Sequence, residues 1–238
     1  MGDRLAGGRR LTGGDEILRP RRCLAQGGCL LTGARRARGG LAAGSRRGVT
    51  RVTGVTDSGA VQRWDLLGER VVLDGFRRVL SRRYRMPSGT ESDWEILDGG
   101  RTVAVEAVTE EGRVLLVRQF RPGPGRILLE IPGGYVEQGE SVEDAAAREL
   151  LEETGFKAGS LEVVGKSWLS ATATNERYAV VARDCRWVAE PTPDVDEFIE
   201  LVELSMSDFL QHALSGQLTD ADIALRALVA LNVLNPTP

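Results

Sequence analysis

The sequence contains little histidine, cysteine or lysine. Of its 238 residues one is a histidine, His212, three are cysteines, and 29 of the 31 basic residues are arginines. Cys23, Cys29 and Cys185 are too few, and odd in number, for a disulfide framework. With a single histidine the chain offers no zinc spacing, and a histidine-based catalytic triad would depend wholly on His212. These absences exclude a disulfide scaffold and favour a reducing, cytoplasmic location.

Long hydrophobic runs are absent as well. A membrane-spanning helix needs about 18 or more consecutive apolar residues, and no stretch approaches that length. A secretory signal needs an apolar core of about seven to fifteen residues. The best candidate, around residues 29–31, is interrupted by glycines and by Gln26. We therefore expect no membrane partner and no export.

The first sixty residues differ in composition from the rest. Their 12 arginines and four acidic residues give a net charge of +8, whereas the other residues carry 19 basic and 30 acidic side chains, a net charge of −11. They also hold 14 of the 29 glycines and contain no Phe, Tyr or Trp, so they cannot bury a core. We predict a disordered Arg/Gly-rich tail at residues 1–62 and a folded domain at residues 63–238.

An arginine-rich tail has other interpretations. Arginine clusters attract nucleic-acid phosphates, and a later start, at Val49 or Val55, would remove most of the tail. Arginine supplies nearly all the basic residues along the whole chain, however, so its abundance in the tail is not special. Like-charged tails are also usually only solvated. We therefore expect no nucleic-acid partner.

Turn signals divide the folded part into short strands and a few helices. The predicted strands are residues 70–73, 76–85, 102–108, 114–120, 161–164, 177–182 and 198–204. The predicted helices are residues 141–154, 207–214 and 221–234. The segments 102–108 and 114–120 flank a turn and are expected to form a hairpin. This order predicts a mixed α/β (α+β) domain.

The helix at residues 141–154 has the clearest local signals. Ser141 and Asp144 form a capping box at its start, and three alanines follow. Gly155 stands where a helix of this length would end.

Three glutamates of this helix, Glu149, Glu152 and Glu153, are separated by three and four positions, so their carboxylates leave one side together. Arg148 can reach Glu152 at i,i+4 but cannot neutralise all three. A hard divalent cation such as Mg²⁺ is the natural counter-charge. A solvated acidic helix face is the alternative.

A glycine-rich loop, Pro132–Gly134, precedes the helix and favours the metal interpretation. Glycine lets the backbone turn tightly and lets a carbonyl such as that of Gly133 approach a cation.

The complete spacing runs from Gly134 over five residues to Glu140 and over seven more to Arg148-Glu149-Leu150-Leu151-Glu152-Glu153-Thr154-Gly155-Phe156. It resembles the Nudix box, Gly-x5-Glu-x7-Arg-Glu-U-x-Glu-Glu-x-Gly-U with U apolar, at every defining position. Chance would produce such a match in fewer than about one chain per million of this length. The resemblance implies a Nudix fold, a mixed β-sheet sandwiched between helices, and hydrolysis of a nucleoside diphosphate linked to another group. Glu140 is expected to orient Arg148 or the loop.

The same resemblance implies roles for the helix residues. Glu149 and Glu153 would bind Mg²⁺ or Mn²⁺ with the carbonyl of Gly133, and Glu152 would lie close enough to join the metal cluster. Glu152 and Arg148 are also candidate catalytic residues.

The resemblance covers roughly residues 64–234 and points to the ADP-ribose pyrophosphatase branch. It rests on residues 116–121 and 129–134, and on residues 168–176, where Ala171 and Thr172 replace the Pro and Gly of the branch. The substrate-binding residues that it implies are Arg118, Arg121, Glu130, Ser170 and Glu176. Two strand residues three apart point to opposite faces, and we favour Arg121 over Arg118 for the pocket face.

The acidic loop at residues 190–200 is expected to supply the general base that deprotonates the attacking water. Glu197 best matches the position of that base in the branch, with Asp194, Asp196 and Glu200 as rivals. A merely solvated acidic loop is the alternative, since loops carry both charge and catalysis.

The implied partner is a small-molecule nucleotide, ADP-ribose or a related nucleoside diphosphate sugar. GDP-mannose, dinucleoside polyphosphates and coenzyme A stay open, because the box indicates pyrophosphate chemistry and not the leaving group. The branch is commonly homodimeric with exchanged N-terminal strands, so we expect residues 63–100 to contribute to a homodimer. A non-catalytic nucleotide-sensing module ranks lower, because every carboxylate of the box is present.

Overall fold

The structure is a computed structural model that describes residues 61–194 and 197–235. All of these belong to one compact unit, residues 55–238. Except for residues 61 and 62, the predicted tail therefore lies outside the described residues, and so does Asp196.

A mixed sheet forms the body of this unit. Its strands run in the order β10-β5-β4-β9-β7, with β6 paired to β5 and β8 paired to β9. The pair β4–β9 is parallel, whereas β5 pairs antiparallel with β4, β6 and β10, and β9 pairs antiparallel with β7 and β8. The strand bounds are β4 Arg101–Thr109, β5 Arg113–Arg121, β6 Arg126–Glu130, β7 Phe156–Lys157, β8 Ser160–Trp168, β9 Glu176–Trp187 and β10 Glu200–Ser205.

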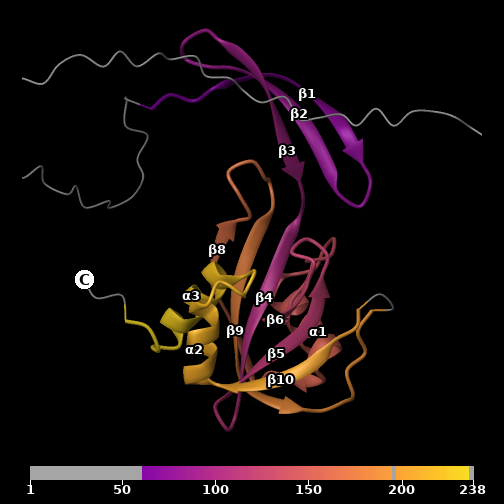
Figure 1. Ribbon diagram of the computed structural model, residues 1–238, viewed down its shortest axis with the longest axis vertical. Coiled ribbons are helices and arrows are strands. Elements are labelled where there is room, and N and C mark those ends of the chain that lie inside the picture. The colour runs from indigo at the N-terminus through magenta and orange to yellow at the C-terminus, as the bar shows by residue number, and fades with distance from the viewer. Residues whose placement is uncertain (1–60, 195–196, 236–238) are drawn as a thin grey trace, which may run out of the picture. The chain divides into compact units, whose positions relative to one another are not determined.

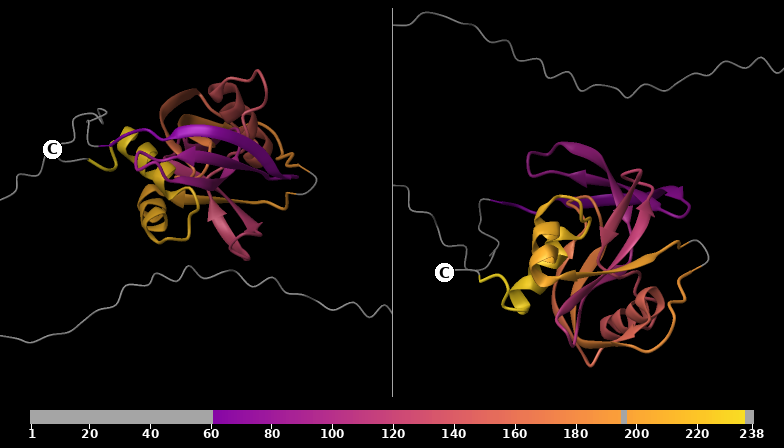
Figure 2. Two further views of the ribbon diagram at one scale, coloured as in Figure 1. Left: turned by 90° about the horizontal axis from the view of Figure 1, so that it is seen from above. Right: turned by 60° about the horizontal axis from the view of Figure 1, so that its bottom comes forward.

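Helices cover both faces of this sheet. Alternate residues of β4 point to opposite sides, so Val103 and Val105 pack in the core beneath α1 (Val142–Thr154), whereas Ala104 packs in the core beneath α2 (Met206–Leu214) and α3 (Ala221–Ala230). Figures 1 and 2 show α1 on one side of the sheet and α2 and α3 on the other. The predicted mixed sheet between helices is confirmed.

The caps of α1 explain its bounds. The Ser141 hydroxyl accepts a hydrogen bond from the Asp144 amide at 3.0 Å and donates one to the Asp144 carboxylate at 2.7 Å. At the other end Gly155 adopts φ 74° and donates to the Leu151 carbonyl at 2.8 Å. The predicted capping box and stop are both present.

The structure corrects two details of the sequence prediction. The helix expected at residues 221–234 ends at Ala230, because Asn232 turns left-handed (φ 58°) and the amide of Val233 folds back onto the Leu228 carbonyl at 2.9 Å. The expected hairpin of β4 and β5 pairs only at Ala107 and Val108 of β4, because another segment replaces β5 farther along.

That segment is the glycine-rich loop. The amides of Val103 and Val105 donate to the carbonyls of Gly134 and Pro132 at 2.9 and 2.8 Å, and the amide of Val136 donates to Arg101 at 3.0 Å. The loop thus continues the sheet beside the first half of β4 and is fixed by backbone hydrogen bonds.

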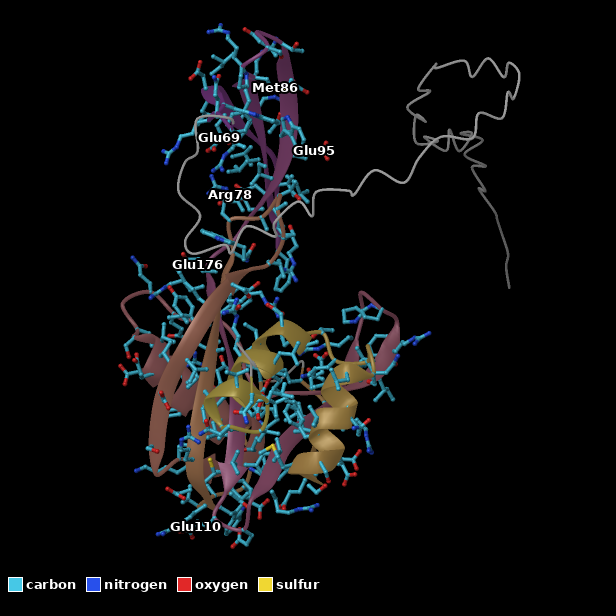
Figure 3. All side chains as sticks on the ribbon, turned by 90° about the vertical axis from the view of Figure 1, so that its left-hand side faces the viewer. Glu69, Arg78, Met86, Glu95, Glu110 and Glu176 are labelled. Carbon is cyan, nitrogen blue, oxygen red and sulfur yellow. The ribbon has the colours of Figure 1, made fainter. Side chains whose placement is uncertain are left out.

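A smaller antiparallel sheet precedes β4. It consists of β1 (Asp65–Asp74), β2 (Arg78–Arg85) and β3 (Glu91–Asp98) in that order. Every residue of β1 is exposed. Figure 3 labels Glu69, Arg78 and Glu95 in this sheet, and it shows Glu176 and Glu110 at opposite ends of the larger sheet. Within residues 61–194 and 197–235, no helix combines the length and the apolar character that crossing a bilayer requires.

Candidate active site

At Gly133 and Gly134 the backbone of the glycine-rich loop lies too close to its neighbours to leave room for a side chain. A Cβ on Gly133 would lie 2.2 Å from the Val103 carbonyl oxygen, and one on Gly134 would lie 2.3 Å from the Glu149 carboxylate. Pro132 and Gly134 direct their carbonyls to β4. Successive residues of an extended strand direct their polar groups to opposite sides, so Gly133 presents its own amide and carbonyl away from β4. The Gly133 amide donates to Glu153 at 2.9 Å.

Two of the three helix carboxylates are enclosed at this point. Glu153 is only 3% exposed, and burial raises its pKa to about 8, with further upward contributions from the charges of Glu149 and Glu197. Burial also raises the pKa of Glu149, although Arg148 acts against the shift. Burial therefore makes the ionised forms of both acids costly, and a positive partner would offset that cost.

Arg148 ties this acidic group to the loop. Its guanidinium holds both oxygens of Glu140 at 3.0 and 3.2 Å, contacts Glu149 at 2.8 Å and Glu152 at 3.1 Å, and donates to the Tyr135 carbonyl at 2.9 Å. The expected i,i+4 contact to Glu152 is therefore present, and Glu140 orients Arg148 as expected. Glu152 is the most exposed of the three helix acids.

The acidic loop before β10 brings one carboxylate to the group. The charge of Glu197 raises the pKa of both Glu149 and Glu153, so these three side chains lie within electrostatic range of one another. The rival Glu200 instead pairs with Arg118 at 2.9 Å. Asp194 accepts at its backbone carbonyl from the Glu197 amide at 2.9 Å.

The donor set fits a hard divalent cation. Glu149 and Glu153 supply carboxylate oxygens, Gly133 offers a backbone carbonyl beside the amide that bonds Glu153, and Glu197 adds negative charge within electrostatic range of both acids. In the part of the chain that the structure describes, no three His, Cys, Asp or Glu side chains are already close enough together to hold a metal ion. The physical reason is that Arg148 holds Glu149 and the Gly133 amide holds Glu153, so a cation would have to compete with these two contacts.

A cavity of about 250 Å³ opens beside the loop. Its wall includes Gly133 and Gly134, Tyr135 and the guanidinium groups of Arg77, Arg121 and Arg177. Arg121 forms an ion pair with the fully buried Glu130, whose other oxygen accepts from the Thr219 amide at 3.1 Å. The predicted residues Arg121 and Glu130 are therefore brought to the loop.

Other predicted residues lie elsewhere. Arg118 and Glu200 flank a separate, mostly apolar hollow of the β5–β10 edge. Ser170 and Glu176 line a second hollow of about 650 Å³ with Trp168 and Arg101, and Glu176 pairs there with Lys166 at 2.5 Å. Their role in substrate binding stays a prediction.

The residues that sequence reasoning missed are Asn175, Arg177 and Asp220. Arg177 bonds to Asp220 and, at 2.9 Å, to Asp222, and all three missed residues line the cavity beside the loop. Strand alternation places Asn175 and Arg177 on the side opposite Glu176. That signal was present in the sequence, but nothing in the sequence showed which side holds the cavity.

Comparison with known proteins places this geometry in a family. The model of the NUDIX domain matches residues 99–224. An ADP-ribose pyrophosphatase of Bacillus subtilis (strain 168) is 38% identical over 141 residues, which cover 58% of this chain and 76% of that protein. A methanol dehydrogenase activator of Bacillus methanolicus is 33% identical over 143 residues, 57% of this chain and 75% of that protein.

Among solved structures, one described as an ADP compounds hydrolase superposes with a TM-score of 0.63. It covers 74% of this chain and 100% of its own, with 22% sequence identity. At that identity the likeness concerns the fold, and it agrees with the predicted Nudix fold.

Proposed function

The chain belongs to the Nudix hydrolase family, and from this premise we propose that it hydrolyses the pyrophosphate bond of ADP-ribose or of a related nucleoside diphosphate sugar, with Mg²⁺ as the cofactor and Mn²⁺ able to replace it. The products are a nucleoside monophosphate and a sugar phosphate. The observation that carries the proposal is the group formed by Glu149, Glu153 and Glu197 against the Gly133 backbone, next to a cavity lined by arginines.

Glu149, Glu153 and the carbonyl of Gly133 would hold the cation. When bound, it supplies charge neutralisation to the diphosphate and lowers the pKa of a coordinated water. Arg148 positions the carboxylates: through Glu140 and the Tyr135 carbonyl it is anchored to the loop, so Glu149 and Glu152 keep a fixed relation to Gly133.

Glu197 would act as the general base. The water oxygen forms the new bond to phosphorus, the bridging P–O bond breaks, and the proton of the water passes to the Glu197 carboxylate. The contacts support Glu197 over Glu200, because Glu200 is engaged by Arg118 at the sheet edge.

Arg121 supports substrate binding at the cavity. Its pairing with the buried Glu130 fixes the direction of the guanidinium, and fixed guanidinium groups suit phosphate oxygens. The charge of Arg121 also lowers the pKa of Glu153, so this residue of the cavity wall lies within electrostatic range of the acidic group.

A homodimer is part of the proposal. β1 exposes Leu66, Val71 and Leu73, and Phe76 in the turn after β1 is 91% exposed. A sheet with so much uncovered apolar surface is suited to contact a second copy. Light scattering after gel filtration should give twice the chain mass at micromolar concentration, and a monomer would contradict this part.

The activity is tested by incubating ADP-ribose with Mg²⁺ and following the products by phosphorus NMR. Glu153→Gln should lose about 1,000-fold or more in kcat, because metal stabilisation of developing charge is worth several kcal/mol. Glu162→Gln is the matched control, since Glu162 is exposed on β8 and pairs with Arg183, away from the cavity beside the loop. Binding of ADP-ribose without turnover by the wild type would instead favour a sensing module.

A further inference from the structure

The side-chain oxygen of Asn175 is buried and has no hydrogen-bond partner in the part of the chain that the structure describes. The residue is 3% exposed, and its Oδ1 atom is enclosed and unpaired among the described residues. Buried side-chain amides are nearly always bonded, so an unpaired one requires an explanation. Asn175 lines the 250 Å³ cavity beside Gly133 and Gly134.

The surroundings hold Asn175 in place without bonding its side chain. Its carbonyl accepts from the Leu169 amide at 3.2 Å, and the next residue, Glu176, donates to the Gly100 carbonyl at 3.3 Å. The amide group fills the space over Gly99, where a Cβ would lie 1.9 Å from Nδ2. A rotation about the last side-chain torsion exchanges the oxygen and the nitrogen, so the site can accept or donate a hydrogen bond.

The rest of the cavity restricts what Asn175 can bind. Arg121 is paired with Glu130, and Arg177 is paired with Asp220 and Asp222, so two of the three arginines already have anionic partners. The volume lies below the roughly 300 to 1,000 Å³ of sites for drug-sized ligands. The wall thus offers donors and acceptors side by side, which suits the hydroxyls of one sugar ring attached to the diphosphate that Arg121 is proposed to bind.

We propose that Asn175 is a specificity-determining residue that hydrogen-bonds a ring hydroxyl of the substrate's sugar, in a cavity formed beside the Gly133–Gly134 loop. The proposal rests on the proposed function for the identity of the substrate. The ligand class is a ribosyl or related sugar hydroxyl attached through the diphosphate. Asp220 and Thr219, which also line the cavity, supply further oxygen groups for the same ring.

The test asks whether the loss caused by substituting Asn175 depends on one particular hydroxyl of the substrate. Wild type, Asn175→Ala and Asn175→Asp are compared with ADP-ribose and with analogues that lack a hydroxyl on either ribosyl ring. Hydrolysis gives kcat and KM with Mg²⁺, and titration calorimetry gives Kd. Gln211→Ala, an exposed amide on α2, is the control, and thermal melts check that each variant is folded.

With ADP-ribose, Asn175→Ala should lose about 10-fold to 100-fold in kcat/KM and in affinity, the usual loss for a buried polar contact left unpaired. With the analogue that lacks the contacted hydroxyl, the variant and the wild type should be equal. Asn175→Asp keeps the shape and the acceptor and should lose less than Asn175→Ala.

An equal penalty for Asn175→Ala on every analogue, or no penalty at all, would overturn the proposal. Tight binding with the expected coupling but without turnover would overturn the proposed hydrolysis and leave the role of Asn175 supported. A wild type that neither binds nor hydrolyses any of the sugar nucleotides would overturn both.

Discussion

The two sheets of this protein are stabilised in different ways. The larger sheet buries apolar side chains on both faces, and the residues that pack under its helices, such as Leu115, Leu150 and Phe209, are fully enclosed. The smaller sheet leaves β1 exposed and is joined across its strands by ion pairs, such as Arg82 with Glu69 at 2.6 Å. The larger sheet therefore has the buried apolar contacts that a rigid site requires, whereas every residue of β1 in the smaller sheet is exposed.

The pKa of a glutamate side chain shifts in opposite directions in the two sheets. Burial raises the pKa of Glu106 on β4 to about 8, whereas hydrogen bonds from Arg85 and Arg83 lower the pKa of Glu91 on β3. The difference teaches that the surroundings, and not the residue type, determine where charge is tolerated. Six substitutions, grouped in four experiments, test this contrast.

The largest expected effect is on core packing. Leu150→Ala in α1 should lower the free energy of unfolding by about 2 to 5 kcal/mol, because Leu150 is completely enclosed and the cavity left by truncation cannot collapse. In protein dilute enough to be monomeric, Leu73→Ala in β1 should change it by less than about 0.5 kcal/mol, because Leu73 is 54% exposed in the single chain. Urea unfolding checks both, and similar losses in the two variants would contradict the contrast.

The second effect concerns close approach at the loop. Gly134→Ala should reduce kcat by about 100-fold, because the new Cβ displaces the Glu149 carboxylate and a shift of about 1 Å can cost that much. Gly75→Ala, between β1 and β2, meets nothing within 4 Å and should keep full activity. Steady-state kinetics with ADP-ribose provide the comparison, and equal activity of the two variants would remove the proposed role of Glu149.

The third effect is a pH dependence of stability. Neither carboxylate oxygen of Glu106 has a partner among the described residues. Its folded pKa of about 8 exceeds the ordinary value of 4.5, so only the unfolded state ionises between these pH values. The contribution of Glu106 is therefore most favourable below pH 4.5, declines as the pH rises, and is fully lost above about pH 8.

Glu106→Gln removes this titration. We expect the decline in unfolding free energy between pH 5 and pH 8 to be smaller in the variant by on the order of 2 kcal/mol, a value reduced from the full linkage because buried sites are partly screened. Urea unfolding at a series of pH values measures it. Parallel curves for wild type and variant would show that Glu106 ionises freely.

The smallest effect is expected at the exposed ion pairs. Glu91→Gln removes the acceptor of Arg83 and Arg85, so the lowered pKa of Glu91 disappears, but exposed pairs contribute little to stability. Its melting temperature should equal that of the wild type above pH 5 within experimental error. A clear loss of stability would show that the smaller sheet depends on its ion pairs more than we infer.

Local rules predicted much of the fold. Helix α1 begins and ends where its capping box and Gly155 indicated, and the spacing of Glu149, Glu152 and Glu153 placed their carboxylates on one side, since helix geometry depends only on sequence separation. Apolar runs predicted β4, β5, β10 and parts of β8 and β9, whereas the short strands β6 and β7 were not predicted. The pairing partner of the first half of β4 was not predicted, because residues 132–136 replace β5 there through backbone hydrogen bonds that no side-chain pattern encodes.

By itself, the sequence determined the acidic helix, its glycine-rich loop and the family to which they belong, because these features depend on residues close together in the chain. Only the tertiary structure showed that Arg118 pairs with Glu200, and that Asn175 lines the cavity beside the loop while Glu176 lines a different hollow. Those positions depend on how β5, β9 and α3 pack together, and packing joins residues whose separation along the chain carries no local signal.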